Sequence, residues 1–343
     1  MTWNDFFQSV RAGTLDRVYL FSGPEEWIKR EAVEALRTKL LPPGLEQLNE
    51  ASLEGVTAQE IIDAAETLPM MCERRIVVVR DWAPLLPGKS KNEESETELL
   101  EKWLKNPPES CVTVFYMRTE PDGRKKGVSM LKKSAAYVSF DALSDAELSK
   151  WTAARLKPLG KRMGTAALNT LSFMAGRDLT RLAGELDKLA AYVGERAAIE
   201  EADVREIVSA SLEYNVFELL NRLLEGKVGE AQRMVNTLLQ GGQTAIGILA
   251  MLTRQLRQLA HVRYALDGGE PVERVQTVLR MHPYAAKQTA RQCRSRAADD
   301  FRALYEQCVA ADYDVKSGRL RDSMALDAIL LKIAMPKLAS EWN

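Results

Sequence analysis

Short apolar runs alternate with amphipathic stretches over the first 140 residues. Four short, mainly apolar runs predict buried strands: 18–21, 76–79, 112–116 and 137–140. Amphipathic stretches between them predict helices. Strands that alternate with helices favour a mainly parallel sheet flanked by helices.

Local signals place some of the helix ends. Thr57 followed by Glu60 is a capping box and predicts a helix over about 57–67. Pro24 is suited to the first position of a helix that follows the first strand. The segment 89–98 is strongly charged and predicts a loop.

The strand pattern ends after Asp141. Helical patterns then continue to about Met335, and glycines separate them. The polar segment 213–215 is a candidate linker between two helical parts. We therefore expect an α/β domain at 1–140, a small helical domain at 141–211 and a larger helical bundle at 212–343.

Composition excludes several classes of protein. The chain has 343 residues, and its net charge of −1 excludes a protein that holds nucleic acid by bulk charge. Four cysteines without a CxxC pair predict free thiols in a reducing compartment. No signal peptide and no membrane span are expected, so the predicted location is the cytoplasm.

Residues that carry catalysis are scarce. The two histidines, His261 and His282, lie in or beside predicted helices and are expected to be structural. No G-x-S-x-G, H-E-x-x-H or metal-ligand motif occurs. We expect no catalytic residue, no metal and no cofactor in this chain.

The turn after the first strand lies where a phosphate-binding loop would lie. Such a loop reads G-x-x-x-x-G-K-[ST]. Here Gly23 is followed by Pro24 and Glu25, no second glycine occurs, and two carboxylates stand where phosphate would bind. The sequence therefore predicts a degenerate phosphate loop that does not bind ATP.

Five segments, in order along nearly the whole chain, resemble the delta subunits of bacterial DNA polymerase III clamp loaders. They are 19–26 (YLFSGPEE), 75–82 (RIVVVRDW), 178–189 (DLTRLAGELDKL), 215–219 (NVFEL) and 248–257 (ILAMLTRQLR). The resemblance implies an ATPase-like parallel-sheet domain, a helical lid domain and a C-terminal helical collar.

The resemblance also implies a role and partners. A delta subunit binds the ring-shaped sliding clamp (the beta subunit) and holds it open for loading onto primed DNA. It assembles with gamma/tau and delta-prime through the collar, and it does not itself hydrolyse ATP. Polymerase or nucleotidyltransferase chemistry would belong to the assembly. An active ATPase of the same architecture and a helical scaffold without clamp binding remain alternatives.

Met70 and Met71, with Leu68, lie between the predicted helix at 57–67 and the strand at 76–79. Apolar residues at such a place usually fill the core. The resemblance implies instead that this pair inserts into a pocket of the clamp. Methionine is flexible and polarizable, which suits an apolar pocket.

Basic residues form two groups in the C-terminal part. Lys287, Arg291 and Arg294 share one helix face by their spacing, and Lys316 and Arg319 flank Gly318. Solvated faces or subunit contacts are the usual roles of such groups, and phosphate contact with DNA is the alternative.

Overall fold

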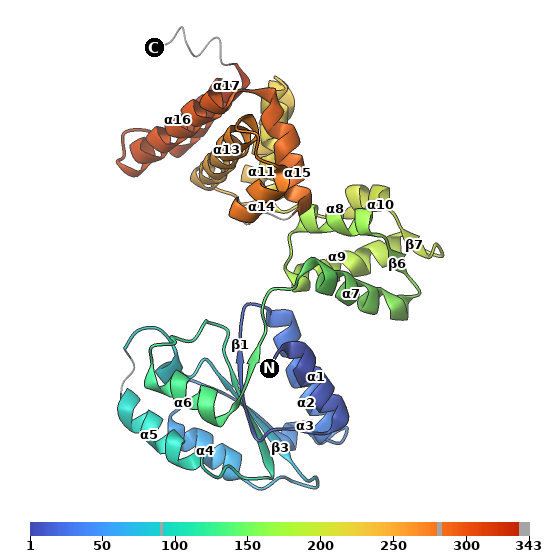
Figure 1. The fold of residues 1–343 in the computed structure, drawn as a ribbon, viewed down its shortest axis with the longest axis vertical. Coiled ribbons are helices and arrows are strands. Elements are labelled where there is room, and N and C mark those ends of the chain that lie inside the picture. The colour runs from blue at the N-terminus through green and yellow to red at the C-terminus, as the bar shows by residue number, and fades with distance from the viewer. Residues whose placement is uncertain (90–91, 280–282, 336–343) are drawn as a thin grey trace. The chain divides into compact units, whose positions relative to one another are not determined.

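The computed structural model describes residues 1–89, 92–279 and 283–335 (Figure 1). The chain divides into two compact units, residues 1–151 and 152–343. The helix α7 (Asp145–Leu156) spans the point of division. Each unit is described separately below.

The first unit is built on a five-stranded parallel sheet. Its strands are β1 (Val18–Ser22), β2 (Glu50–Glu54), β3 (Arg75–Arg80), β4 (Cys111–Tyr116) and β5 (Ala136–Ser139). They lie in the order β2-β3-β4-β1-β5, and every neighbouring pair is parallel. The carboxyl ends of all five strands therefore meet at one edge of the sheet.

Helices cover both faces of this sheet (Figure 1). One face carries α1 (Trp3–Ala12), α2 (Glu26–Leu40) and α3 (Glu46–Asn49). The other carries α4 (Ala58–Glu66), α5 (Glu93–Trp103) and α6 (Lys126–Ser134). A short 3-10 helix, η1 (Ala83–Leu85), follows β3.

The three central strands, β3, β4 and β1, form because their side chains are buried on both faces. In β1, Leu20 joins the core under α4, α5 and α6, whereas Phe21 lies on the other face in edge contact with Phe6 of α1, at 5.1 Å between ring centroids. All five residues of β1 and all six of β4 are buried. A parallel strand buried in this way reads as a continuous apolar run.

The sequence pattern missed five elements of this unit, namely β2, the helices α1, α3 and α6, and the 3-10 helix η1. The edge strand β2 is partly exposed and carries two glutamates, so it lacks the apolar run of its neighbours. The helices α1 and α6 are short and were not predicted. The charged segment expected to be a loop is helical from Glu93, because α5 begins there with three glutamates in its first turn, where the helix dipole favours them.

The second unit is almost entirely helical. Its first part contains the end of α7, η2 (Lys157–Leu159), α8 (Thr165–Ala175), α9 (Leu179–Tyr192) and α10 (Glu201–Ile207). Two two-residue strands, β6 (Arg162–Met163) and β7 (Ala198–Ile199), pair in parallel. They correct the expectation that no strand follows Asp141.

The remaining helices form a bundle. They are α11 (Leu212–Leu224), α12 (Val228–Gln240), α13 (Ala245–Asp267), α14 (Val272–Leu279), α15 (Pro283–Gln292), η3 (Cys293–Ser295), α16 (Ala298–Lys316) and α17 (Asp322–Ala334). The long helix α13 packs along α16, and its leucines join one apolar core with α11 and α17.

The linker predicted at 213–215 is wrong. These residues form the first turn of α11, whose N-terminus is capped by Ser211: its hydroxyl accepts from the amide of Tyr214 at 3.2 Å. Three polar residues in a row suggested a loop, but a helix tolerates them near its N-terminus. The boundary expected between residues 211 and 212 stays a prediction.

The predicted fold class, a parallel-sheet α/β domain followed by helical domains, is confirmed. Within the residues that the structure describes, no helix has both the length and the apolar character that crossing a membrane requires.

Candidate functional site

The turn after β1 is closed by the protein's own backbone. Gly23 has a φ of +120°, and a Cβ at this residue would lie 2.3 Å from the carbonyl oxygen of Phe140. The amide of Glu25 donates to that same oxygen at 3.1 Å. This amide therefore faces Phe140 instead of a phosphate, and Pro24 has no amide hydrogen to offer. The helix α2 begins at Glu26, two residues later than Pro24 suggested.

Lys29 has the spacing from Gly23 that the lysine of a phosphate loop has, six residues on. Its side chain is fully buried. The ammonium donates to the carbonyl oxygen of Met117 at 2.6 Å and forms an ion pair with Glu26. The charge that would meet phosphate in a nucleotide site is thus neutralised inside the protein.

The carboxyl ends of β3 and β4 are joined by a second set of polar contacts. Asp81, with a left-handed φ of 43°, accepts from the amide of Arg118 at 2.8 Å and from that of Thr119 at 3.2 Å. The Arg118 guanidinium also donates to it at 2.5 Å. Burial would raise the pKa of Asp81, but these hydrogen bonds outweigh burial and lower it.

No group of three or more potential metal ligands occurs among the described residues. His261 is exposed on α13. His282 lies outside the described residues. The structure thus brings together no histidine-based or metal-based constellation within the ranges it describes.

The loop between α4 and β3, residues 67–74, is the strongest candidate for a binding surface, and we call it the Met70 loop. Leu68 is 76% exposed, Met70 54% and Met71 84%. The alternative that the methionines fill the core is therefore wrong. Large apolar side chains grouped at the surface are typical of interaction sites.

The side chain of Asn49 fixes the backbone of the Met70 loop. It is fully buried at the end of α3. Its side-chain amide donates to the carbonyl oxygens of Met70 at 2.9 Å and Leu45 at 3.1 Å, while its Oδ1 accepts from the amide of Met70 at 2.6 Å. Both backbone groups of Met70 are thereby bound by one side chain.

The two ends of the loop are also fixed. The Thr67 hydroxyl donates to the carbonyl oxygen of Asp63 at 2.7 Å, and the Arg75 guanidinium donates to the carbonyl oxygen of Thr67 at 3.2 Å. Met71 adopts a φ of +58°, an uncommon conformation for a residue with a long side chain. The loop is therefore a defined structure that presents its apolar side chains outward.

Sequence reasoning missed Asn49 and its neighbour Leu48. Leu48 is 50% exposed and lies one residue before the contact with Met70. It is a further exposed apolar residue close in the chain to the residue that holds the Met70 loop. A lone asparagine and a lone leucine in a polar segment give no periodic signal, so only the fold reveals their place.

The basic residues differ in how they are paired. Lys287 and Arg291 on α15 and Arg294 in η3 are exposed. Lys316 forms an ion pair with Asp312 at 2.7 Å. Arg319 lies 3.4 Å from Asp314 and over the ring of Tyr313. The group on α15 and η3 is therefore the better candidate for contact with a polyanion.

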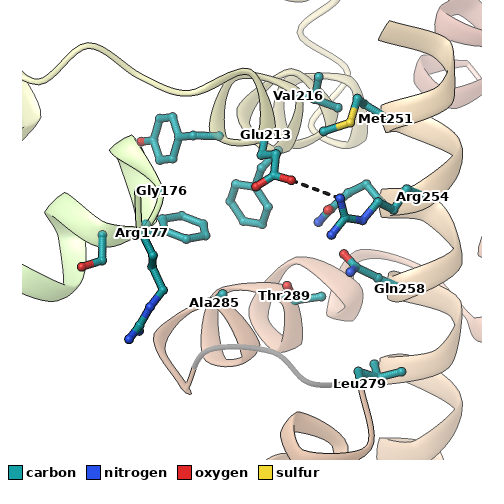
Figure 2. A pocket seen from close by; sticks show the side chains of 15 residues that line it. Gly176, Arg177, Glu213, Val216, Met251, Arg254, Gln258, Leu279, Ala285 and Thr289 are labelled. Carbon is teal, nitrogen blue, oxygen red and sulfur yellow. Dashed lines mark hydrogen bonds and ion pairs between the residues drawn. The ribbon is translucent and has the colours of Figure 1, made fainter. Parts of the chain in front are cut away.

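A pocket of about 390 Å³ in the second unit lies among α8, α11, α13 and α15 (Figure 2). Arg254 and Glu213 form an ion pair at 3.1 Å on its wall. Phe173 packs against Tyr214, Phe217 and Tyr284, with ring centroids 5.1–5.4 Å apart. None of the predicted site residues lines this pocket.

Comparison with known proteins gives consistent matches over most of the chain. The family model described as "DNA polymerase III, delta subunit" matches residues 19–141, and that of the C-terminal domain of the same subunit matches residues 213–333. The DNA polymerase III subunit delta of Bacillus subtilis (strain 168) is 29% identical over 334 residues, 96% of each chain. The probable DNA polymerase III subunit delta of Aquifex aeolicus (strain VF5) is 23% identical over 76% of this chain and 74% of its own.

A solved structure is also similar. The DNA clamp loader delta protein of Bacillus subtilis superposes with a TM-score of 0.59 at 27% identity, covering 97% of this chain and 99% of its own. The similarity therefore extends over both units.

Proposed function

This chain belongs to the DNA polymerase III delta subunit family, and from that premise we propose that it binds the sliding clamp through the Met70 loop and holds the ring open for loading. As a member of the family it is a subunit of the clamp loader and works in DNA replication. The observation that carries the proposed site is the exposure of Leu68, Met70 and Met71 on one fixed loop.

The Met70 loop has the chemistry of an anchor. Fully burying an apolar side chain contributes about 1.5–3 kcal/mol. Met70 and Met71 together would therefore contribute about 3–6 kcal/mol, a large part of the roughly 8 kcal/mol of a micromolar contact, and Leu68 would add to it. Opening a ring requires more than this, so shape complementarity and the assembled complex supply the remainder.

The subunit itself is proposed to have no enzymatic activity. In the phosphate loop, the amide of Glu25 faces Phe140 and the ammonium of Lys29 is paired with Glu26. Both features disfavour the binding of a nucleotide at this turn. The alternative of an active ATPase therefore has no support from this site. Any polymerase or nucleotidyltransferase activity belongs to the assembly, and no cofactor is proposed.

Other partners follow from the family and the surface. The helical bundle, residues 212–343, would serve as the collar that joins gamma/tau and delta-prime subunits. The exposed group Lys287, Arg291 and Arg294 would contact primed DNA or a neighbouring subunit, with Lys316 and Arg319 in a secondary role. The proposed place of action is the cytoplasm, where the bacterial chromosome is replicated.

Titration calorimetry with the sliding clamp of the same cell tests the proposed site. We expect the wild-type chain to bind, and the double variant Met70→Ala/Met71→Ala to bind about 30-fold or more weakly, as central apolar anchors do. The matched control is Met324→Ala/Leu331→Ala, which removes two apolar residues of α17 that are about as exposed as Met70.

The outcomes separate the function from the site. Strong binding that the loop variant does not weaken would leave clamp binding in place and exclude the Met70 loop as its anchor. Failure of the wild-type chain to bind at tens of micromolar would contradict clamp binding itself.

A further inference from the structure

Asn49 is a buried polar residue whose hydrogen bonds serve the Met70 loop. Its side chain makes three hydrogen bonds, and two of them bind the amide and the carbonyl of Met70. The two residues are 21 positions apart in the sequence. The side chain of Asn49 thus binds the amide and the carbonyl of Met70 as the backbone of a neighbouring strand would.

The conformation of the loop needs such a support. Met71, directly after Met70, has a left-handed φ that a residue with a Cβ rarely adopts. It is also 84% exposed, so little packing of its own side chain holds it. A strained backbone persists only where its surroundings fix it, and the double contact at Met70 is the nearest fixed point.

Fixing a loop before binding strengthens binding. A flexible loop loses conformational entropy when a partner orders it, and a loop that is already ordered avoids that loss. We propose that Asn49 is a positioning residue for clamp binding: it holds the backbone at Met70 so that the side chains of Met70 and Met71 are presented in the bound conformation. This inference rests on the proposed function of the Met70 loop.

The first test uses the free protein and needs no clamp. Hydrogen exchange of the backbone amides is measured in the wild type and in Asn49→Ala. We expect exchange over residues 67–74 to quicken about tenfold or more while β3 is unchanged. The control Thr97→Ala removes a buried hydroxyl that donates to the carbonyl oxygen of Glu93 at 2.7 Å within α5, and it should leave the loop unchanged.

The second test measures affinity for the clamp, per folded molecule. We expect Asn49→Ala to weaken binding about tenfold, and Asn49→Asp to weaken it as well, because a carboxylate oxygen would then face the carbonyls of Met70 and Leu45. Thr97→Ala should bind as the wild type does. In the background Met70→Ala/Met71→Ala, the change at Asn49 should have little further effect, since the side chains that it positions are gone.

The outcomes distinguish this inference from the proposed function. Normal clamp binding by Asn49→Ala, with weak binding by Met70→Ala/Met71→Ala, would overturn the role of Asn49 and keep the site. Equal loss of exchange protection in the loop and in β3 would mean that Asn49 stabilises the fold as a whole and not the loop in particular. That result would overturn the inference. Absence of binding by the wild type would overturn the proposed function, whereas the exchange experiment would still decide whether Asn49 orders the loop.

Discussion

The four cysteines differ sharply in their surroundings. Cys111, Cys293 and Cys308 are buried, and burial raises the pKa of all three thiols, that of Cys308 to about 12. Cys72 lies in the Met70 loop next to Met71 and is only partly buried. A thiol reacts as its thiolate, and only where a reagent can reach it. The reactive thiol is therefore expected to be Cys72, which lies beside the proposed clamp contact.

We therefore expect alkylation at pH 8 to modify Cys72 first, with the other three thiols reacting only as the protein unfolds. Saturating clamp should slow the modification of Cys72, because the contact would cover it. Mass spectrometry of the modified peptides measures both effects. The variant Cys72→Ser should lack the fast reaction, and rapid modification that the clamp does not slow would contradict contact at this loop.

At the scale of elements, side chains join neighbouring strands where the backbone ladder ends. Asp81 binds two amides and the guanidinium beyond the end of β4, so it ties that end to β3. Its carboxyl pKa is lowered from its ordinary value of 3.8. A lowered pKa in the folded state means that the ionised carboxylate stabilises the fold.

The pH dependence follows from that direction. The contribution of Asp81 is complete above the unfolded pKa and is lost as the pH falls through the lower, folded pKa. We expect the free energy of unfolding, measured in urea between about pH 5 and pH 3, to fall more steeply in the wild type than in Asp81→Asn. Parallel curves for the two proteins would contradict the role assigned to this carboxylate.

The elements that the sequence could predict are those with buried, continuous apolar runs. The strands β1, β3 and β4 were predicted because both of their faces are covered. The edge strand β5 is only partly buried, and its apolar residues Tyr137 and Val138 were enough to predict it. The edge strand β2 has one exposed side and escaped prediction. The start of α11 was mistaken for a linker, since polar residues at a helix N-terminus look like those of a loop.

The candidate site, too, could be predicted from the sequence only in part. The contact at Met70 and Met71 was predicted from the family resemblance alone, because their residue types and position by themselves favour core filling. The degenerate phosphate loop, predicted from the missing second glycine, stays a prediction. Neither Asn49 nor the internal pairing of Lys29 with Glu26 was predictable, because each depends on residues brought together only by the fold.

At the scale of the whole molecule, the chain combines a five-stranded parallel sheet with a turn after β1 whose amide and nearby lysine are bound by the protein's own groups. We expect 5 mM Mg-ATP, on the order of 100 times a typical dissociation constant, to leave the melting temperature unchanged. A ligand at that ratio would stabilise the native state by about 2.7 kcal/mol, which calorimetry detects readily. Magnesium alone is the control. A rise of several degrees in the melting temperature with Mg-ATP would contradict this prediction and support the ATPase alternative.

The buried ammonium of Lys29 also limits how the turn after β1 could be redesigned. Removing Lys29 alone would destabilise the fold. The Glu26 carboxylate would lose its ion pair, and the carbonyl oxygen of Met117 would lose its hydrogen-bond donor. Replacing the buried Ile28 by glycine alone would open a cavity, and Lys29 would still be paired inside the protein. Building a phosphate-binding loop at this turn would therefore need changes at Ile28 and around Lys29 together, because each change alone would destabilise the fold.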